Sequence, residues 1–179
     1  MNKGFSLIEI LVVVSIMALL SGFMIVYTRG SENQIKILKD KAVFIGALYR
    51  AKSLALRTFV SSDVKVCGYG LYVIDEERFV LWRDISSSDS CSGANRIYDG
   101  TLENFEDPLL LSKGIIFSNR SDANFFKSIL FIPPNPDIIS LPVILPNELF
   151  KIALSTADGK SSAFLEVSQS GQAQSAVGY

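Results

Sequence analysis

The chain opens with a short polar segment followed by a long apolar run. Residues 5–27 contain one charged side chain, Glu9, and no proline. At about 1.5 Å per residue, a helix of this length reaches roughly 35 Å, which is enough to cross a hydrocarbon core of about 30 Å. The pattern therefore predicts a transmembrane helix over about residues 5–27.

A second apolar pattern follows at helical spacing. Its members are Ile35, Leu38, Ala42, Ile45, Leu48 and Tyr49, widened by Phe44, Ala51 and Ala55. Spacings of three and four residues predict a helix with one apolar face. We expect one long helix over residues 5–58, whose second half packs against a β-sheet. A separate helix belonging to a bundle is the alternative.

After residue 58 the helical period gives way to short β-like runs separated by turn residues. The expected strands are residues 64–67 continuing into 70–74, then 79–82, 115–117, 129–132, 149–154 and 164–167. Asp75-Glu76-Glu77 and residues 157–160, which contain Asp-Gly, are expected turns. Residues 85–101 form a Ser-rich loop, prolines mark loops or sheet edges, and the tail after Ser168 is expected to be partly ordered at most. The fold class is α+β, with a β-rich antiparallel domain over residues 59–179.

The carboxylate of Glu9 is the unexpected feature of the apolar run. A charged side chain at the centre of a membrane helix costs about 2.5–3.5 kcal/mol on insertion scales. A secretory signal would be shorter and free of charge in its apolar part. A plain single-pass anchor leaves Glu9 and the residues before it unexplained.

Those residues are Lys3, Gly4 and Phe5, followed by Ser-Leu-Ile-Glu at residues 6–9. This order resembles the class III leader of type IV pilins and pseudopilins. The resemblance implies that a prepilin peptidase cuts between Gly4 and Phe5 and removes residues 1–4. It also implies that Phe5 becomes the mature N-terminus and is N-methylated.

Cleavage would create a positive amine on Phe5, one helical turn from Glu9. In a filament, the Glu9 carboxylate of one subunit would meet the Phe5 amine of a neighbour. Removing either partner of a buried ion pair leaves the other charge uncompensated, which is strongly destabilising. We therefore expect Glu9 and Phe5 to form an assembly charge pair that sets the axial register.

The rest of the chain is similar to the minor-pseudopilin GspH/FimT family. The resemblance is carried by AKSLALRT at residues 51–58, Trp82, FIPPN at residues 131–135 and VSQSGQ at residues 167–172. It implies a non-enzymatic structural subunit of a type II secretion pseudopilus or a type IV pilus. The implied partners are the prepilin peptidase, other pilins or pseudopilins, the inner-membrane assembly platform and membrane lipid. Basic residues flank both ends of the apolar run, so the resemblance alone implies a cytoplasmic N-terminus and an exported β domain.

Composition narrows the chemistry that the exported part can perform. The chain has no histidine and a formal net charge of −1. The absence of histidine removes Ser/His/Asp and Cys/His nucleophile arrangements, and neither catalytic residues nor a cofactor is expected. Arg50, Lys52 and Arg57 cluster on the expected helix while other basic residues are scattered, so nucleic-acid binding is not expected. A DNA-uptake minor pilin and a membrane-anchored binding domain unrelated to filaments remain the alternative functions.

The two cysteines, Cys67 and Cys91, both fall in the expected exported part. A disulfide between them would close a loop of about 25 residues, worth roughly 3 kcal/mol in the chain-entropy model. Two free thiols are the alternative. No metal site is expected, because Asp84, Asp89 and Asp99 do not follow the EF-hand spacing. Residues 68–70, Gly-Tyr-Gly, are expected to form a β-turn.

Overall fold

The computed structural model describes part of the chain. The described residues are 6–57, 65–86, 90–118, 125–133, 137–141, 143, 149–168 and 171–176, with side chains described for all of these except residues 25–31, 175 and 176. The chain divides into two compact units, Met1–Ile35 and Lys36–Tyr179. Helix α1 extends from Leu7 to Leu56 and is the one α-helix among the described residues. The expected helix ends at residues 5 and 58 lie outside them.

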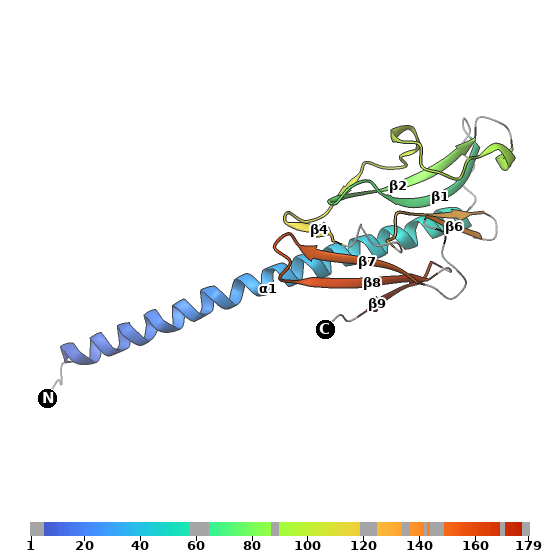
Figure 1. Cartoon of the computed structure of the whole chain (residues 1–179). Coiled ribbons are helices and arrows are strands. Elements are labelled where there is room, and N and C mark those ends of the chain that lie inside the picture. Colours follow the sequence, from blue (N-terminus) through green and yellow to red (C-terminus); the bar gives the residue numbers. More distant parts are fainter. Residues whose placement is uncertain are drawn as a thin grey trace. The chain divides into compact units, whose positions relative to one another are not determined.

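The β strands of the second unit belong to two antiparallel sheets (Figure 1). The first sheet has the order β3-β2-β1-β5-β6, with β1 at Lys65–Val73, β2 at Arg78–Ser86, β3 at Leu109–Leu110, β5 at Ser128–Ile132 and β6 at Asp137–Leu141. The second has the order β4-β7-β8-β9, with β4 at Ile115–Phe117, β7 at Leu149–Thr156, β8 at Ser162–Ser168 and β9 at Ala173–Ala176. The predicted α+β class is confirmed. The described strands form two sheets, whereas the sequence predicted packing of the helix against one.

Both predicted tight turns are confirmed. Strands β1 and β2 form a hairpin around residues 75–77, closed by a hydrogen bond from the Ile74 N–H to the Arg78 carbonyl at 3.0 Å. Strands β7 and β8 form another, with Gly159 at φ 70° donating its N–H to the Thr156 carbonyl at 2.8 Å. Glycine suits that position because residues that carry a Cβ rarely adopt a positive φ.

The prediction of a turn at residues 68–70 is wrong. Both glycines lie inside β1, which is continuous apart from an irregularity between Val66 and Gly68. A Cβ built on Gly70 would lie 2.1 Å from the Ile129 carbonyl oxygen and 2.8 Å from Trp82 Nε1. Glycine is present because a neighbouring strand and an indole ring approach the backbone closely, and not because the chain reverses direction.

Two further strands depart from the sequence prediction. Asp137–Leu141 forms β6 at the edge of the first sheet, although its apolar run is short and flanked by prolines. Ala173–Ala176 forms β9, so the tail is more ordered there than expected. Each pairs with the strand that precedes it in the chain, β6 with β5 and β9 with β8, so its hydrogen bonds come from an edge that this neighbour offers.

The second half of α1 buries part of the predicted apolar face, since Phe44, Leu48, Ala51 and Ala55 are buried as expected. Its buried apolar residues are Ile37, Phe44, Ala47, Leu48, Ala51 and Ala55. Leu38 and Tyr49, predicted to face the core, are 60% and 47% exposed. The Phe44 ring packs on Phe79 of the first sheet at 5.0 Å and on Phe117 of the second at 6.0 Å. A large ring between the sheets, flanked by alanines that let the strands approach, determines the buried face.

Two adjacent charged residues of α1 are buried beside this core. The Asp40 carboxylate accepts hydrogen bonds from the N–H and hydroxyl of Ser112, each at 2.8 Å. The Lys41 ammonium donates to the carbonyl of Phe164 in β8 at 3.0 Å, and burial lowers the pKa of Lys41. Asp40 therefore binds the segment joining β3 to β4, while Lys41 binds the second sheet.

Candidate functional site

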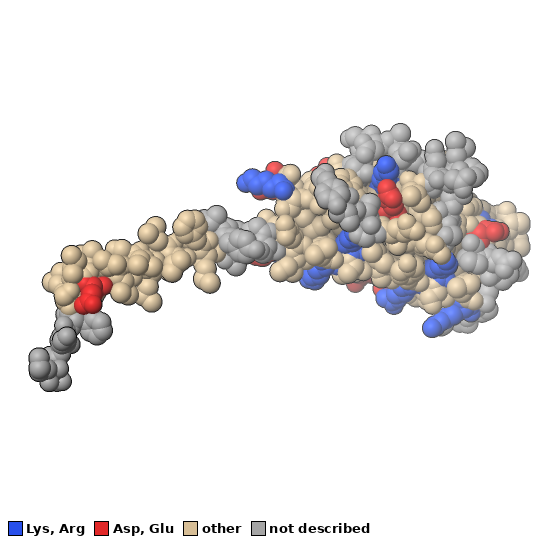
Figure 2. All heavy atoms as spheres, turned by 90° about the horizontal axis from the view of Figure 1, so that it is seen from below, with Lys and Arg blue, Asp and Glu red and all other residues tan. Residues whose placement is uncertain are grey.

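Within the first unit, residues 7–24 form a mostly apolar stretch of α1 whose side chains are exposed. Leu7–Met24 is long and apolar enough to cross a membrane, and none of it is buried within the protein. Its large apolar side chains are exposed on every side of the helix. In Figure 2 this segment is tan apart from one acidic patch. A helix that is apolar all round requires an apolar environment, either lipid or other helices.

Two serines interrupt the apolar surface without leaving their hydroxyls unpaired. Ser15 donates its hydroxyl to the Leu11 carbonyl at 2.8 Å, and Ser21 donates to the Met17 carbonyl at 2.7 Å. Each bond connects a residue to the fourth one before it, so the hydroxyl is satisfied within the helix. These serines add little cost to transfer of the helix into hydrocarbon, since no donor is left unpaired.

Glu9 has a local structural role that the sequence analysis did not identify. The Ser6 N–H donates to Glu9 Oε2 at 3.2 Å, and the Glu9 N–H donates to Ser6 Oγ at 3.3 Å. This reciprocal pair is a capping box, which satisfies two backbone N–H groups at the start of a helix. The sequence signal was present, because Ser-x-x-Glu before an apolar run is the signature of this cap.

The structure describes only part of the predicted leader site. Gly4 and Phe5, the predicted cleavage and N-methylation positions, lie outside the described residues. Glu9 is described and exposed, in the first turn of α1. The charge pair between Glu9 and Phe5 of a neighbouring subunit therefore stays a prediction.

The second unit also presents an exposed apolar stripe on α1. Leu38, Ala42 and Tyr49 are exposed and Ile45 is partly buried, at successive spacings of four, three and four residues. The exposed charges beside it are basic, because Asp40 is the one acidic residue of α1 in this unit and it is buried. Such a stripe suits contact with another apolar helix.

The basic cluster expected on this helix is partly neutralised. Arg50 forms an ion pair with Glu106, and its Nη1 donates to Glu106 Oε2 at 2.8 Å. Arg57 is exposed at the end of the helix, and Lys52 is half-buried. Figure 2 shows basic side chains spread along one face of this unit and interspersed with acidic ones.

Cys67 and Cys91 are joined by a disulfide with an S–S distance of 2.04 Å. Cys67 lies in β1 and is buried, whereas Cys91 begins a 3-10 turn, η1, at Cys91–Gly93. The link attaches the Ser-rich loop to the first sheet. It closes a loop of about 25 residues, for which chain entropy predicts roughly 3 kcal/mol of stabilisation.

The carboxylate of Asp84 is fully buried next to this disulfide. Its Oδ2 lies 3.3 Å from Arg96 Nη1, and its Oδ1 has no hydrogen-bond partner among the described residues. Burial raises the pKa of Asp84 above its usual value, although the Arg96 charge opposes this effect. Burial also raises the pKa of nearby Glu103, whose Oε2 accepts the Asp99 N–H at 2.7 Å.

These acids do not form a metal centre in the part of the chain that the structure describes. No three acidic or cysteine side chains there are placed to hold a metal ion. Asp84 is paired with a guanidinium, Asp99 lies beside Glu103, and Asp89 lies outside the described residues.

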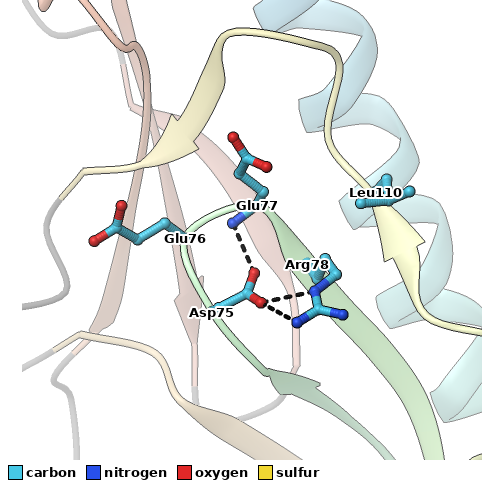
Figure 3. A pocket seen from close by; sticks show the side chains of 5 residues that line it. All are labelled: Asp75, Glu76, Glu77, Arg78 and Leu110. Carbon is cyan, nitrogen blue, oxygen red and sulfur yellow. Dashed lines mark hydrogen bonds and ion pairs between the residues drawn. The ribbon is translucent and has the colours of Figure 1, made fainter.

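The β1–β2 turn lines a shallow groove of about 520 Å³ (Figure 3). Asp75 accepts hydrogen bonds from the Arg78 side chain at 2.7 Å and from the Glu77 N–H at 3.0 Å. The side chains of Glu76 and Glu77 are exposed, and Leu110 borders the groove. The pKa of Asp75 is low because these hydrogen bonds outweigh the effect of burial. A solvated turn explains these carboxylates better than acid–base catalysis does.

Residues 1–25 match the family model described as the prokaryotic N-terminal methylation motif, the signature of type IV pilins. The match covers the predicted cleavage position and most of the apolar helix, and it supports a type IV pilin-like protein with a structural role. Comparison with curated proteins and with solved structures finds no significant match.

Proposed function

We propose that this protein is a minor pilin or pseudopilin that joins a filament through α1 after cleavage between Gly4 and Phe5. The observation that carries the proposal is the methylation motif over residues 1–25 on a helix that is apolar and exposed on every side. Lipid surrounds these apolar side chains before assembly, and the helices of other subunits pack against them afterwards.

The exposed stripe of Leu38, Ala42 and Tyr49 supports a second contact along the same helix. Neighbouring pilin helices are the partners that suit it, because helices with complementary apolar stripes pack side by side. The disulfide supports export of the β domain, since such bonds persist in oxidising compartments. In this proposal the N-terminus faces the cytoplasm and the protein also contacts the prepilin peptidase and the inner-membrane assembly platform.

Within this class, the resemblance to the GspH/FimT family favours a tip or minor component of a type II secretion pseudopilus or a type IV pilus. DNA binding by the filament is not favoured, because the ion pair with Glu106 neutralises Arg50, one of the clustered positive charges. Phosphate contacts require basic side chains that are available to the nucleic acid.

The direct test is the mass of the mature N-terminus. We expect the protein purified from a host with an active prepilin peptidase to begin at Phe5 and to carry a methyl group on its amine. A Gly4→Val variant serves as the control, because a bulkier residue before the cut should block processing and leave Met1 in place. Recovery of the wild-type chain with residues 1–4 attached, beside correctly processed pilins from the same cells, would refute the proposal.

A further inference from the structure

The Ser-rich loop packs on the face of the first sheet that points away from α1. Along β2, Phe79 and Leu81 point into the core, so Val80, Trp82 and Asp84 point to the opposite face. Trp82 and Asp84 are both fully buried. Their burial requires a cover, and residues 90–107, which begin within the Ser-rich loop and are called the loop below, supply it.

Tyr98 of this loop packs against Trp82 and against the neighbouring strand. Its ring lies 5.8 Å from the Trp82 ring and stacks on Tyr72 of β1 at 4.5 Å. The Tyr98 hydroxyl donates to the side chain of Asn104 at 2.7 Å, and Asn104 forms an isolated bridge with Trp82. The loop thus encloses the indole ring of the one tryptophan in the chain.

Arg96 connects this cover to both halves of the disulfide. Its guanidinium donates to the Cys67 carbonyl at 3.1 Å and to the Cys91 carbonyl at 3.2 Å, while also pairing with Asp84. Arg96 itself has a φ of 64°, the one positive φ among the described non-glycine residues. A left-handed backbone at a long side chain is unfavourable and persists only where the surroundings enforce it.

The buried polar contacts that hold the loop are individually costly. The Asp84–Arg96 pair is buried, and desolvation offsets much of the attraction in such pairs. Asp84 Oδ1 and Trp82 Nε1 are buried without a hydrogen-bond partner among the described residues, which adds a further cost. The covalent bond between Cys67 and Cys91 carries no such cost, and it joins the start of this segment to the sheet beside the ring packing of Tyr98.

We propose that the Cys67–Cys91 disulfide holds residues 90–107 closed over Trp82. Reduction of this bond opens the loop while both sheets stay folded. A dithiol reductant supplies the two electrons and two protons: its thiolate attacks the sulfur of Cys91, which is half-buried. The bond to Cys67 breaks, Cys67 leaves as a thiolate that takes up a proton, and a mixed disulfide between the reductant and Cys91 forms. The second thiol of the reductant then displaces Cys91. The products are two protein thiols and a cyclic disulfide of the reductant. The proposal is independent of filament assembly.

The fluorescence of Trp82 tests this directly, because no other tryptophan contributes. The full chain in detergent micelles is treated with dithiothreitol and alkylated with iodoacetamide, and mass spectrometry counts the modified cysteines. We expect the emission of Trp82 to shift to longer wavelength and its quenching by acrylamide to increase severalfold. Far-UV circular dichroism should retain the sheet signal.

The double variant Cys67→Ser, Cys91→Ser is the matched control. It should show the open-loop fluorescence without reductant and should not respond to dithiothreitol, even if the wild-type disulfide resists reduction. Unchanged quenching in the double variant would overturn the proposal, because the loop would then close without the bond. Loss of the sheet signal in the double variant would also overturn it, since the disulfide would then support the whole domain.

Discussion

Glu9 has two competing explanations, the capping box seen in the structure and the predicted charge pair, and one pair of substitutions separates them. In the free chain, Glu9 completes a capping box with Ser6. In the proposed filament, its charge neutralises the amine of Phe5 on a neighbouring subunit. Glu9→Gln removes the charge and keeps the cap, because glutamine also serves at the third position of a capping box. Ser6→Ala removes one cap hydrogen bond and keeps the charge.

The expected magnitudes differ enough to be measured. Loss of a helix N-cap costs about 1 kcal/mol, which is roughly a fivefold change in an equilibrium constant. Breaking a buried ion pair from one side costs about 3–5 kcal/mol, because the remaining charge is left without a partner. That range corresponds to a loss of roughly a hundredfold to a few thousandfold in the assembly equilibrium. Charge pairing therefore predicts that Glu9→Gln is at least tenfold more severe than Ser6→Ala.

The assay compares equal amounts of processed protein in filament and membrane fractions. Mass spectrometry first establishes that each variant begins at Phe5, because both substitutions lie near the cleavage position. Quantitative immunoblotting then gives the ratio of filament-bound to membrane-bound protein. We expect Glu9→Gln to remain in the membrane and be almost absent from filaments, and Ser6→Ala to be incorporated at a moderately reduced level. Normal incorporation of Glu9→Gln, or equal defects in both variants, would refute the charge-pairing argument.

Three further predictions concern the β-rich unit. Phe44→Ala should lower the free energy of unfolding by about 3–5 kcal/mol in denaturant titrations, whereas Leu38→Ala, at an exposed position, should change it little. Gly70→Ala should prevent close pairing of β1 with β5, seen as faster amide hydrogen exchange in both strands, and native exchange rates would contradict the steric argument. Burial raises the pKa values of Asp84 and Glu103 above 3.8 and 4.5, so the folded protein binds protons before the unfolded chain as pH falls. Their contribution to stability should therefore increase from neutral pH down to those ordinary values, and Asp84→Asn with Glu103→Gln should remove that part of the pH dependence of the unfolding midpoint.

Local signals were sufficient for much of the fold. Runs of β-branched and aromatic residues marked β2, β7 and β8, although β2 continues past the predicted end to Ser86. Asp-Gly at residues 158–159 marked the β7–β8 turn because few other pairs tolerate a positive φ. These features depend on neighbours in sequence, so the sequence alone was enough to predict them.

Features that depend on tertiary neighbours were predicted less well. The second half of α1 has more apolar residues than one face accommodates, and only the packing of Phe44 between two sheets determines which face is buried. Gly70 resembles a turn glycine in sequence, but the close approach of Ile129 and Trp82 is what requires it. Strand β9 has little apolar character and exists because β8 offers it an edge.

The candidate site shows the same division. The length of the apolar helix and the position of Glu9 follow from sequence, and so would the capping box if Ser-x-x-Glu had been interpreted as a cap. The role of Arg96, which binds the carbonyls of both cysteines, could not be predicted because it depends on how a long loop folds back onto the sheet.

The adjacent residues Asp40 and Lys41 have a mechanical consequence. One binds Ser112 in the segment that leads into the second sheet, and the other binds Phe164 inside that sheet. When tension is applied along the axis of α1, these bonds share the load in parallel with the ring packing of Phe44. Rupture then requires several contacts to fail at once, so the β-rich unit should resist extraction by a pulling force better than its equilibrium stability alone would suggest.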